Sequence, residues 1–152
     1  MKATLLLRKD HEKLQVLFEQ FRKASRPGQK DKRAIFEEIR DELTLHSNVE
    51  NEVFYSALKD SSTVKQTSDL VDTLIDDHRR IERLLQEIDA STGNERLLES
   101  KMERLKELVD AHLAREEEDL FSEARHVLSE HRLEELGLEM EQRRRLFTQA
   151  AA

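Results

Sequence analysis

Cysteine is absent from the chain, and proline and glycine are scarce, with one proline and three glycines in 152 residues. The lack of cysteine excludes disulfides, thiolate catalysis, iron–sulfur clusters and cysteine-bound zinc. The shortage of proline and glycine argues against a fold of many strands, which needs frequent turns. Any metal that this chain binds must therefore have nitrogen and oxygen ligands.

Long apolar runs and an excess of positive charge are also missing. No segment reaches the roughly 18 consecutive apolar residues of a membrane span, and the apolar run at residues 5–7 is too short for a signal peptide. We therefore expect no membrane association and a cytoplasmic location. The formal net charge of −7 argues against nucleic acid as a partner, because binding to phosphates requires surplus Lys and Arg.

Charged residues are abundant, at 39% of the chain, and accompany many leucines, a composition typical of long amphipathic helices. Turn-forming residues fall near 25–28, 60–63, 91–94 and 128–129, where Gly93 can end one helix and Asn94 begin the next. Helices are predicted at roughly 3–25, 31–59, 66–91, 95–127 and 130–148. We predict a single all-α domain, with residues 1–127 forming an antiparallel up-down-up-down four-helix bundle and residues 128–152 an additional C-terminal helix.

Apolar residues in the first four predicted helices recur at alternating three- and four-residue steps, the seam that faces a bundle core. In the third helix, for example, the apolar seam residues are Val71, Leu74, Ile81, Leu85 and Ile88. Six seam positions in the four helices are polar instead: His11, His46, Glu50, His78, His112 and Glu116.

The two halves of the chain repeat this polar pattern. Each half has Asp-His on one helix and His-x-x-x-Glu on the next, and the spacing between equivalent residues is 67 for the first histidine and 66 for the other two ligands. We expect two helical hairpins related by a pseudo-twofold axis.

The six polar seam residues predict a metal site. Residues four apart on a helix lie on one face, so each His-x-x-x-Glu pair presents a nitrogen and an oxygen ligand together. Buried imidazoles and carboxylates without partners would each cost several kcal/mol, about 2–7 for a neutral polar group, and coordination removes that cost. Six ligands are too many for one tetrahedral zinc. The repeat predicts two ions, each with two histidines and both sharing the carboxylates, with iron as the favoured metal and manganese or zinc as competitors.

The order His, His-x-x-x-Glu, His, His-x-x-x-Glu over residues 8–121 resembles the hemerythrin-like (HHE cation-binding) family. The resemblance implies an oxo- or hydroxo-bridged non-haem di-iron centre that binds, senses or processes a small molecule such as O2, NO or peroxide. Leu74 stands where the oxygen carriers of the family have a further histidine, and Glu116 follows His112 by four residues where they have an Asp at five. These departures argue against reversible O2 carriage and favour redox or peroxide chemistry.

Other functions stay open at this point. The centre could store or sense iron without turnover, or the bundle could bind zinc or no metal and serve only in protein interaction. A catalase-like or NO- or O2-directed redox activity is compatible with the ligand set, whereas hydrolysis is not expected. A sensor would need a separate protein partner.

Several residues near the predicted ligands have a second interpretation. Glu42 and Glu82 lie one turn from His46 and His78, where they could accept the second ring N–H or form surface salt bridges. Tyr55 follows Glu50 by five residues, a spacing that places it on another face of an α-helix, and it is interpreted as a packing residue.

The C-terminal segment is expected to contribute little to the site. The run Arg143-Arg144-Arg145 is interpreted as a solvated face, and His126 and His131 are expected to be exposed. Because all six predicted ligands precede residue 128, we expect residues 1–127 to bind metal without the tail.

Overall fold

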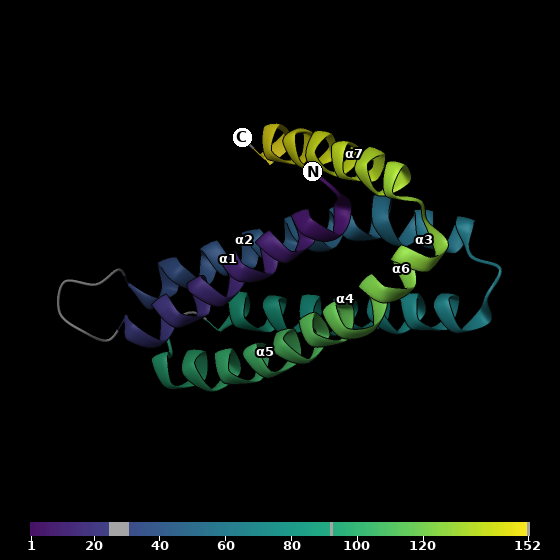
Figure 1. The fold of residues 1–152 in the computed structure, drawn as a ribbon. Helices are drawn as coiled ribbons and strands as arrows, with labels where there is room; N and C mark the ends of the chain where they lie inside the picture. The colour runs from purple at the N-terminus through teal and green to yellow at the C-terminus, as the bar shows by residue number, and fades with distance from the viewer. Residues whose placement is uncertain (25–30, 92, 152) are drawn as a thin grey trace. The chain divides into compact units, whose positions relative to one another are not determined.

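In the computed structural model of the chain, drawn as a ribbon in Figure 1, the described residues are 1–24, 31–91 and 93–151. All regular structure in these three ranges is helical, and no strand occurs in them. The chain divides into two compact units. The first unit combines Met1–Ala57 with Leu128–Ala152, and the second unit is Leu58–Val127.

The first unit is built on a hairpin of two helices, α1 (Ala3–Lys23) and α2 (Lys32–Val49), which pack against each other. Asp31 caps α2, because its side chain accepts a hydrogen bond from the backbone N–H of Arg33. The chain continues from α2 into the π-helix η1 (Glu50–Tyr55) and then into α3 (Ser56–Ser61). The predicted break at 25–28 lies outside the described residues.

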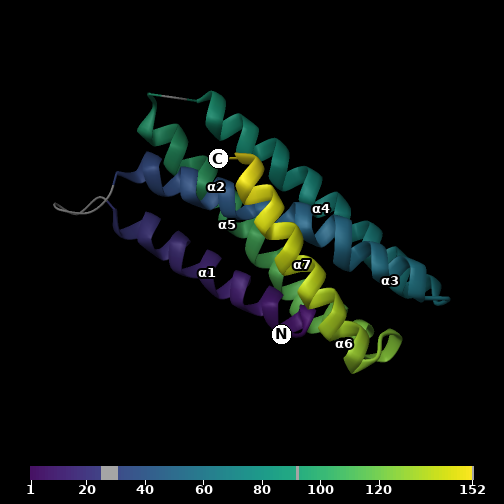
Figure 2. The same cartoon turned by 90° about the horizontal axis from the view of Figure 1, so that it is seen from above.

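The C-terminal helix α7 (Glu130–Ala151) packs on α1, α2 and η1 within the first unit, and Figure 2 shows it in yellow lying over the hairpin. Its buried apolar residues include Leu133, Leu136 and Met140. Gly137 lies against the N-terminus, and a side chain there would collide with the backbone of Met1. Residues 128–152, predicted as an addition to the bundle, therefore share a core with the first hairpin.

The second unit contains an equivalent hairpin, α4 (Lys65–Ala90) and α5 (Glu95–Arg115). Gly93 has a positive φ of 86°, which glycine adopts at little cost, and Asn94 caps α5 by accepting a hydrogen bond from the backbone N–H of Leu97 at 3.0 Å. These two predictions are confirmed, whereas Thr92 lies outside the described residues. The π-helix η2 (Glu116–Leu120) follows α5 and leads into α6 (Phe121–Val127).

Both units depart from the predicted helices at the same place. The sequence predicted uninterrupted α-helices over 31–59 and 95–127, but a π-helical segment begins at Glu50 in one and at Glu116 in the other. A π-helix closes i→i+5 hydrogen bonds, one residue longer than the α-helical loop, and such segments are frequent at functional sites. The periodicity of apolar residues in the sequence did not predict this change.

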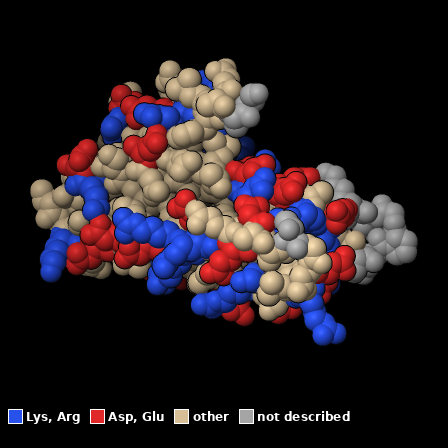
Figure 3. Space-filling view, turned by 180° about the vertical axis from the view of Figure 1, so that it is seen from behind, with Lys and Arg blue, Asp and Glu red and all other residues tan. Residues whose placement is uncertain are grey.

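The predicted seams face the core. The apolar seam of α4 is buried throughout, from Val71 to Ile88, and the six polar seam residues are buried as well. The polar sides of the helices carry the charge, and Lys and Arg are interspersed with Asp and Glu on the face that Figure 3 shows. Among the described residues, no helix combines the length and the apolar character that crossing a membrane requires.

Candidate metal centre

The first unit brings three of the predicted ligands together. His11 lies on α1, His46 lies on α2, and Glu50 is the first residue of η1. Each offers a ligand atom, and these atoms lie within 4.8 Å of one another. His46 Nε2 is 3.2 Å from Glu50 Oε1, as expected of residues one helical turn apart. The three side chains are at most 3% exposed, so they form a buried set of two imidazoles and one carboxylate.

The second unit repeats this set with His78 on α4, His112 on α5 and Glu116 at the start of η2. The Nε2 atoms of the two histidines are 3.1 Å apart, and His112 Nε2 is also 3.1 Å from Glu116 Oε1. All three side chains are buried, and Glu116 is completely so. His112 Nε2 therefore lies next to both the second imidazole and the carboxylate of this unit.

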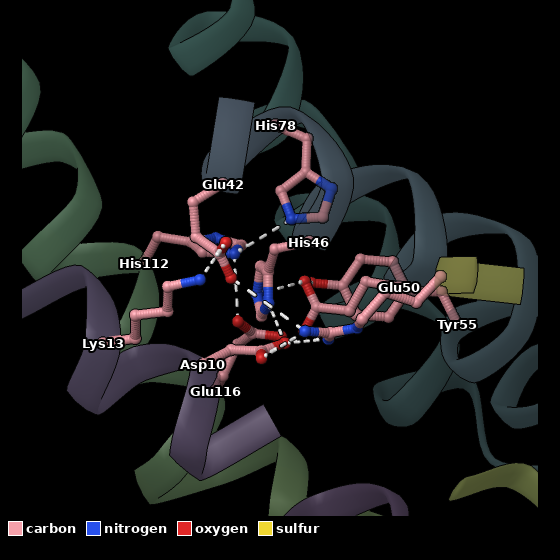
Figure 4. A network of polar contacts seen from close by, with 10 residues as sticks. Asp10, Lys13, Glu42, His46, Glu50, Tyr55, His78, His112 and Glu116 are labelled. Carbon is pink, nitrogen blue, oxygen red and sulfur yellow. Dashed lines mark hydrogen bonds and ion pairs between the residues drawn. The ribbon is translucent and has the colours of Figure 1, made fainter. Parts of the chain in front are cut away.

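An aspartate holds one histidine of each set from the neighbouring helix. His46 Nδ1–H donates to Asp10 Oδ2 at 3.0 Å, a contact drawn in Figure 4, and His112 Nδ1–H donates to Asp77 Oδ2 at the same distance. A ring whose Nδ1 carries the proton presents the lone pair of Nε2 to a metal, and metal-bound histidines usually have such a carboxylate partner. In both units, Nε2 is the atom next to the ligand glutamate.

The environment keeps both aspartates ionised. Burial raises the pKa of the Asp10 carboxyl, but hydrogen bonds from His46 and Arg144 outweigh this effect and lower the pKa to about 2. Burial likewise raises the pKa of Asp77, and hydrogen bonds from His112 and Arg80 lower it to about 2. At neutral pH each aspartate is therefore an acceptor for its histidine.

These aspartates were missed as functional residues, and of the two interpretations left open for Glu42 the structure shows the salt bridge. Glu42 is buried but binds Lys13 Nζ at 2.9 Å, and Glu82 is exposed. The imidazole of His46 turns its Nδ1 edge toward α1 rather than back along α2, so an acceptor on its own helix is out of reach. The Asp-His dipeptide repeated in both halves was the signal that could have identified the true acceptors.

Tyr55 is buried, as expected of a packing residue, but it does not face away from Glu50 as predicted. Its phenol O–H donates to Glu50 Oε1 at 3.1 Å, and Figure 4 labels both residues. Both side chains are buried. In an α-helix, five residues correspond to about 500°, so that Tyr55 would face about 140° away from Glu50. The π-helical turn from Glu50 to Tyr55 closes this angle and brings the phenol onto the carboxylate. The corresponding residue of the second unit, five after Glu116, is Phe121.

The C-terminal arginines are not all solvated. Arg144 donates to both oxygens of Asp10, at 2.8 and 2.5 Å, and its side chain is 23% exposed. Arg143 bonds Glu52 in an exposed pair. The expectation of a solvated run is therefore wrong for Arg144, which reaches the surroundings of the site. His126 and His131 are exposed, as predicted.

The donor atoms fit a transition-metal ion better than any other occupant. The first unit offers two imidazole nitrogens and one carboxylate within 4.8 Å of one another, a set that iron, manganese and zinc all accept. The aspartate behind one imidazole in each set is the arrangement that orients a metal-binding histidine. Within each unit, the residues predicted from the sequence thus come together in a form suited to a cation.

A model of the hemerythrin HHE cation binding domain matches residues 3–124 of the chain. The chain belongs to the hemerythrin HHE cation-binding family. The resemblance inferred from the repeated motif is confirmed. In this HHE domain the six predicted ligands are buried, and the cluster of His11, His46 and Glu50 in the first unit could hold a metal ion.

The HHE fold is confirmed by a solved structure. A crystal structure of a hemerythrin HHE cation binding domain-containing protein from Mycobacterium kansasii matches 99% of this chain and 90% of its own chain, with a TM-score of 0.82. The sequence identity is 24%, so the likeness supports the fold alone. It agrees with the predicted all-α bundle.

A curated relative is much longer than this chain. A protein named DNA nickase, from Nostoc sp. strain PCC 7120, is 27% identical over 134 residues. The match covers 88% of this chain but 36% of the nickase, so the chain spans little more than a third of that relative.

Proposed function

We propose that this HHE domain is a non-haem di-iron protein that binds, senses or processes O2, NO or peroxide. The observation that carries the proposal is the duplicated ligand set, in which each unit presents two buried histidines and a glutamate, with an aspartate behind one histidine. His11, His46 and Glu50 would hold one ion, and His78, His112 and Glu116 the other. The proposal that both ions share the two glutamates rests on the sequence repeat and on family membership.

Bound iron would supply the capacity to bind a small oxidant or NO and to exchange electrons with it. The chain itself supplies orientation and proton placement. Asp10 and Asp77 keep the proton of His46 and His112 on Nδ1, which leaves Nε2 as the ligand atom. The phenol O–H of Tyr55 donates a hydrogen bond to the carboxylate of Glu50. The phenol could therefore keep its proton or pass it to that carboxylate.

Iron is favoured over zinc because of the kind of donors. Three protein ligands in each set, all nitrogen or oxygen, with no cysteine in the chain, suit a metal that retains further positions for solvent or substrate. A closed structural zinc site usually has cysteine among its ligands, and this chain has no cysteine. Storage of iron without turnover remains the alternative within the same metal class.

The test is a visible spectrum of protein loaded with Fe(II) without oxygen and then exposed separately to O2, NO and H2O2. We expect the colourless ferrous protein to develop ligand-to-iron charge-transfer absorption with at least one of the three, and the responding molecule identifies the class of substrate. A protein that takes up iron but shows no change with any of them would support storage. A protein that takes up only zinc in competition with iron would contradict the proposal.

DNA is not part of this proposal. The relative named as a nickase is matched over only 36% of its length, and the net charge of −7 is unfavourable for contact with phosphates.

A further inference from the structure

The C-terminal helix α7 is linked to the proposed ligand His46 through two successive polar contacts. Arg144 of α7 donates to Asp10 Oδ1 at 2.8 Å and to Asp10 Oδ2 at 2.5 Å. Asp10 Oδ2 also accepts the hydrogen bond from His46 Nδ1 at 3.0 Å. The carboxylate of Asp10, which lies on α1, therefore links Arg144 on α7 to His46 on α2.

We propose that Arg144 is a positioning residue for His46, so that docking of α7 sets how tightly the ligand set of the first unit holds its ion. This inference rests on the proposed function, in which His46 is a ligand. Arg144 would touch neither the metal nor a substrate. It would act by fixing the carboxylate that fixes the imidazole.

The geometry suits this role. A guanidinium that donates to both oxygens of a carboxylate fixes the plane and direction of that group, which a single contact with lysine does not do. Asp10 is 4% exposed and Arg144 is 23% exposed in its side chain, so water competes little for the pair. Partners of metal-binding histidines typically change metal affinity by roughly 10–100-fold when they are removed.

The second unit shows that the role is specific to the first. Asp77, which holds His112, accepts hydrogen bonds from Arg80 at 2.7 Å and from Arg115 at 2.5 Å. Both arginines belong to the hairpin of that unit, on α4 and α5. Asp10 instead depends on a residue 134 positions away in the sequence, on a helix that must dock before the contact can form.

A purely structural interpretation is that Arg144 only anchors α7. The chain offers a matched control, because the adjacent Arg143 makes a contact of the same kind from α7 to the same unit. It binds Glu52 at 2.8 Å, and Glu52 is exposed, unlike the buried Asp10. Arg143→Gln therefore removes the same charge and an anchor of α7 while leaving Asp10 in place.

The experiment compares Arg144→Gln with Arg143→Gln by titrating metal-free full-length protein with Co(II) against a competing chelator. We expect the wild-type chain to bind two ions, and Arg144→Gln to weaken one of them by roughly 10–100-fold with the other unchanged. Arg143→Gln should retain wild-type affinity for both. Equal affinities in the two variants would overturn the proposal. If Arg144→Gln lowers the helix content, Arg144→Lys replaces it, because lysine keeps the charge but lacks the two-pronged contact.

A second readout separates failure of this inference from failure of the proposed function. Nitrogen-15 NMR of the histidine rings in the metal-free protein reports whether His46 carries its proton on Nδ1. We expect Arg144→Gln to move the His46 resonances toward a mixture of tautomers and to leave those of His112 unchanged. If the wild type bound no ion, the proposed function would fail, and an unchanged His46 signal in Arg144→Gln would overturn the positioning role independently.

The same coupling works in the opposite direction. If docking of α7 strengthens metal binding, metal binding must strengthen docking of α7 by the same factor. Hydrogen exchange of the α7 backbone amides should therefore slow on loading with Co(II) in the wild type and in Arg143→Gln. Slowing of the same size in Arg144→Gln would contradict the coupling.

Discussion

The two units of this HHE domain share their inner ligands and differ in what surrounds them. Each unit has two histidines, a glutamate at the start of a π-helix, and an aspartate on one imidazole. In the first unit a helix distant in sequence holds the aspartate, and a tyrosine binds the glutamate. In the second unit, local arginines hold the aspartate, and phenylalanine stands in place of the tyrosine.

This comparison indicates that the duplication preserves the predicted ligands but not the residues that contact them. The donor set must satisfy a metal, so its residue types and spacing are fixed in both halves. The surrounding residues need only supply a hydrogen-bond donor or acceptor at the right place, and many positions in a fold can do so. We therefore expect substitutions of inner ligands to act alike in both units, and substitutions of their partners to act differently.

The largest effect is expected from Glu50→Ala. If the two ions share this carboxylate, its loss should weaken both ions by more than about 100-fold, since it removes a ligand from each and leaves two cations with less negative charge between them. Isothermal titration with Fe(II) under anaerobic conditions measures this. The exposed Glu118→Ala serves as the control and should bind both ions normally. Loss of only one ion in Glu50→Ala would show that each unit holds its ion separately.

His78→Leu should remove one ion and leave the other. Leucine suits a seam position, and removal of a buried imidazole should raise the stability of the metal-free protein by about 1 kcal/mol. Urea unfolding of the metal-free protein and the iron content of the loaded protein measure the two effects. His11→Leu, at the equivalent position of the first unit, should behave in the same way, whereas the exposed His126→Ala should change neither quantity. Full iron content in His78→Leu would contradict the symmetric ligand set.

The smallest effect is expected from Tyr55→Phe, which makes the first unit resemble the second. The variant loses one buried hydrogen bond and should lose about 1 kcal/mol of stability in the metal-free state, while both ions still bind. The near-ultraviolet difference spectrum on metal loading should contain a tyrosine signal in the wild type that is absent from the variant. If Tyr55→Phe lost an ion, the phenol would be a ligand and not a partner of Glu50.

The inner layer could be predicted from the sequence because it follows helical periodicity. A histidine or glutamate at a seam position is conspicuous among leucines, and the repeat at 66–67 residues pairs the ligands without any knowledge of the fold. The helix boundaries at Gly93 and Asn94 were predicted for a similar reason, because each residue type has a strong local preference.

The outer layer could not be predicted in the same way. Tyr55 reaches Glu50 only because the helix widens into a π-turn, and no residue type in the sequence predicts that turn. Arg144 reaches Asp10 across 134 residues, a contact that depends on the packing of α7 and not on local pattern. The expectation that residues 1–127 suffice for metal binding took account of the ligands alone and stays a prediction. If Arg144 positions His46 as proposed, removal of α7 would weaken one ion.

The most direct test of the central claim is the metal content of iron-loaded full-length protein, determined by elemental analysis together with the protein concentration from amino-acid analysis. Two matched pairs of histidines, each with a glutamate one turn away, predict two iron ions per chain. One ion per chain, or zinc in place of iron, would contradict the account.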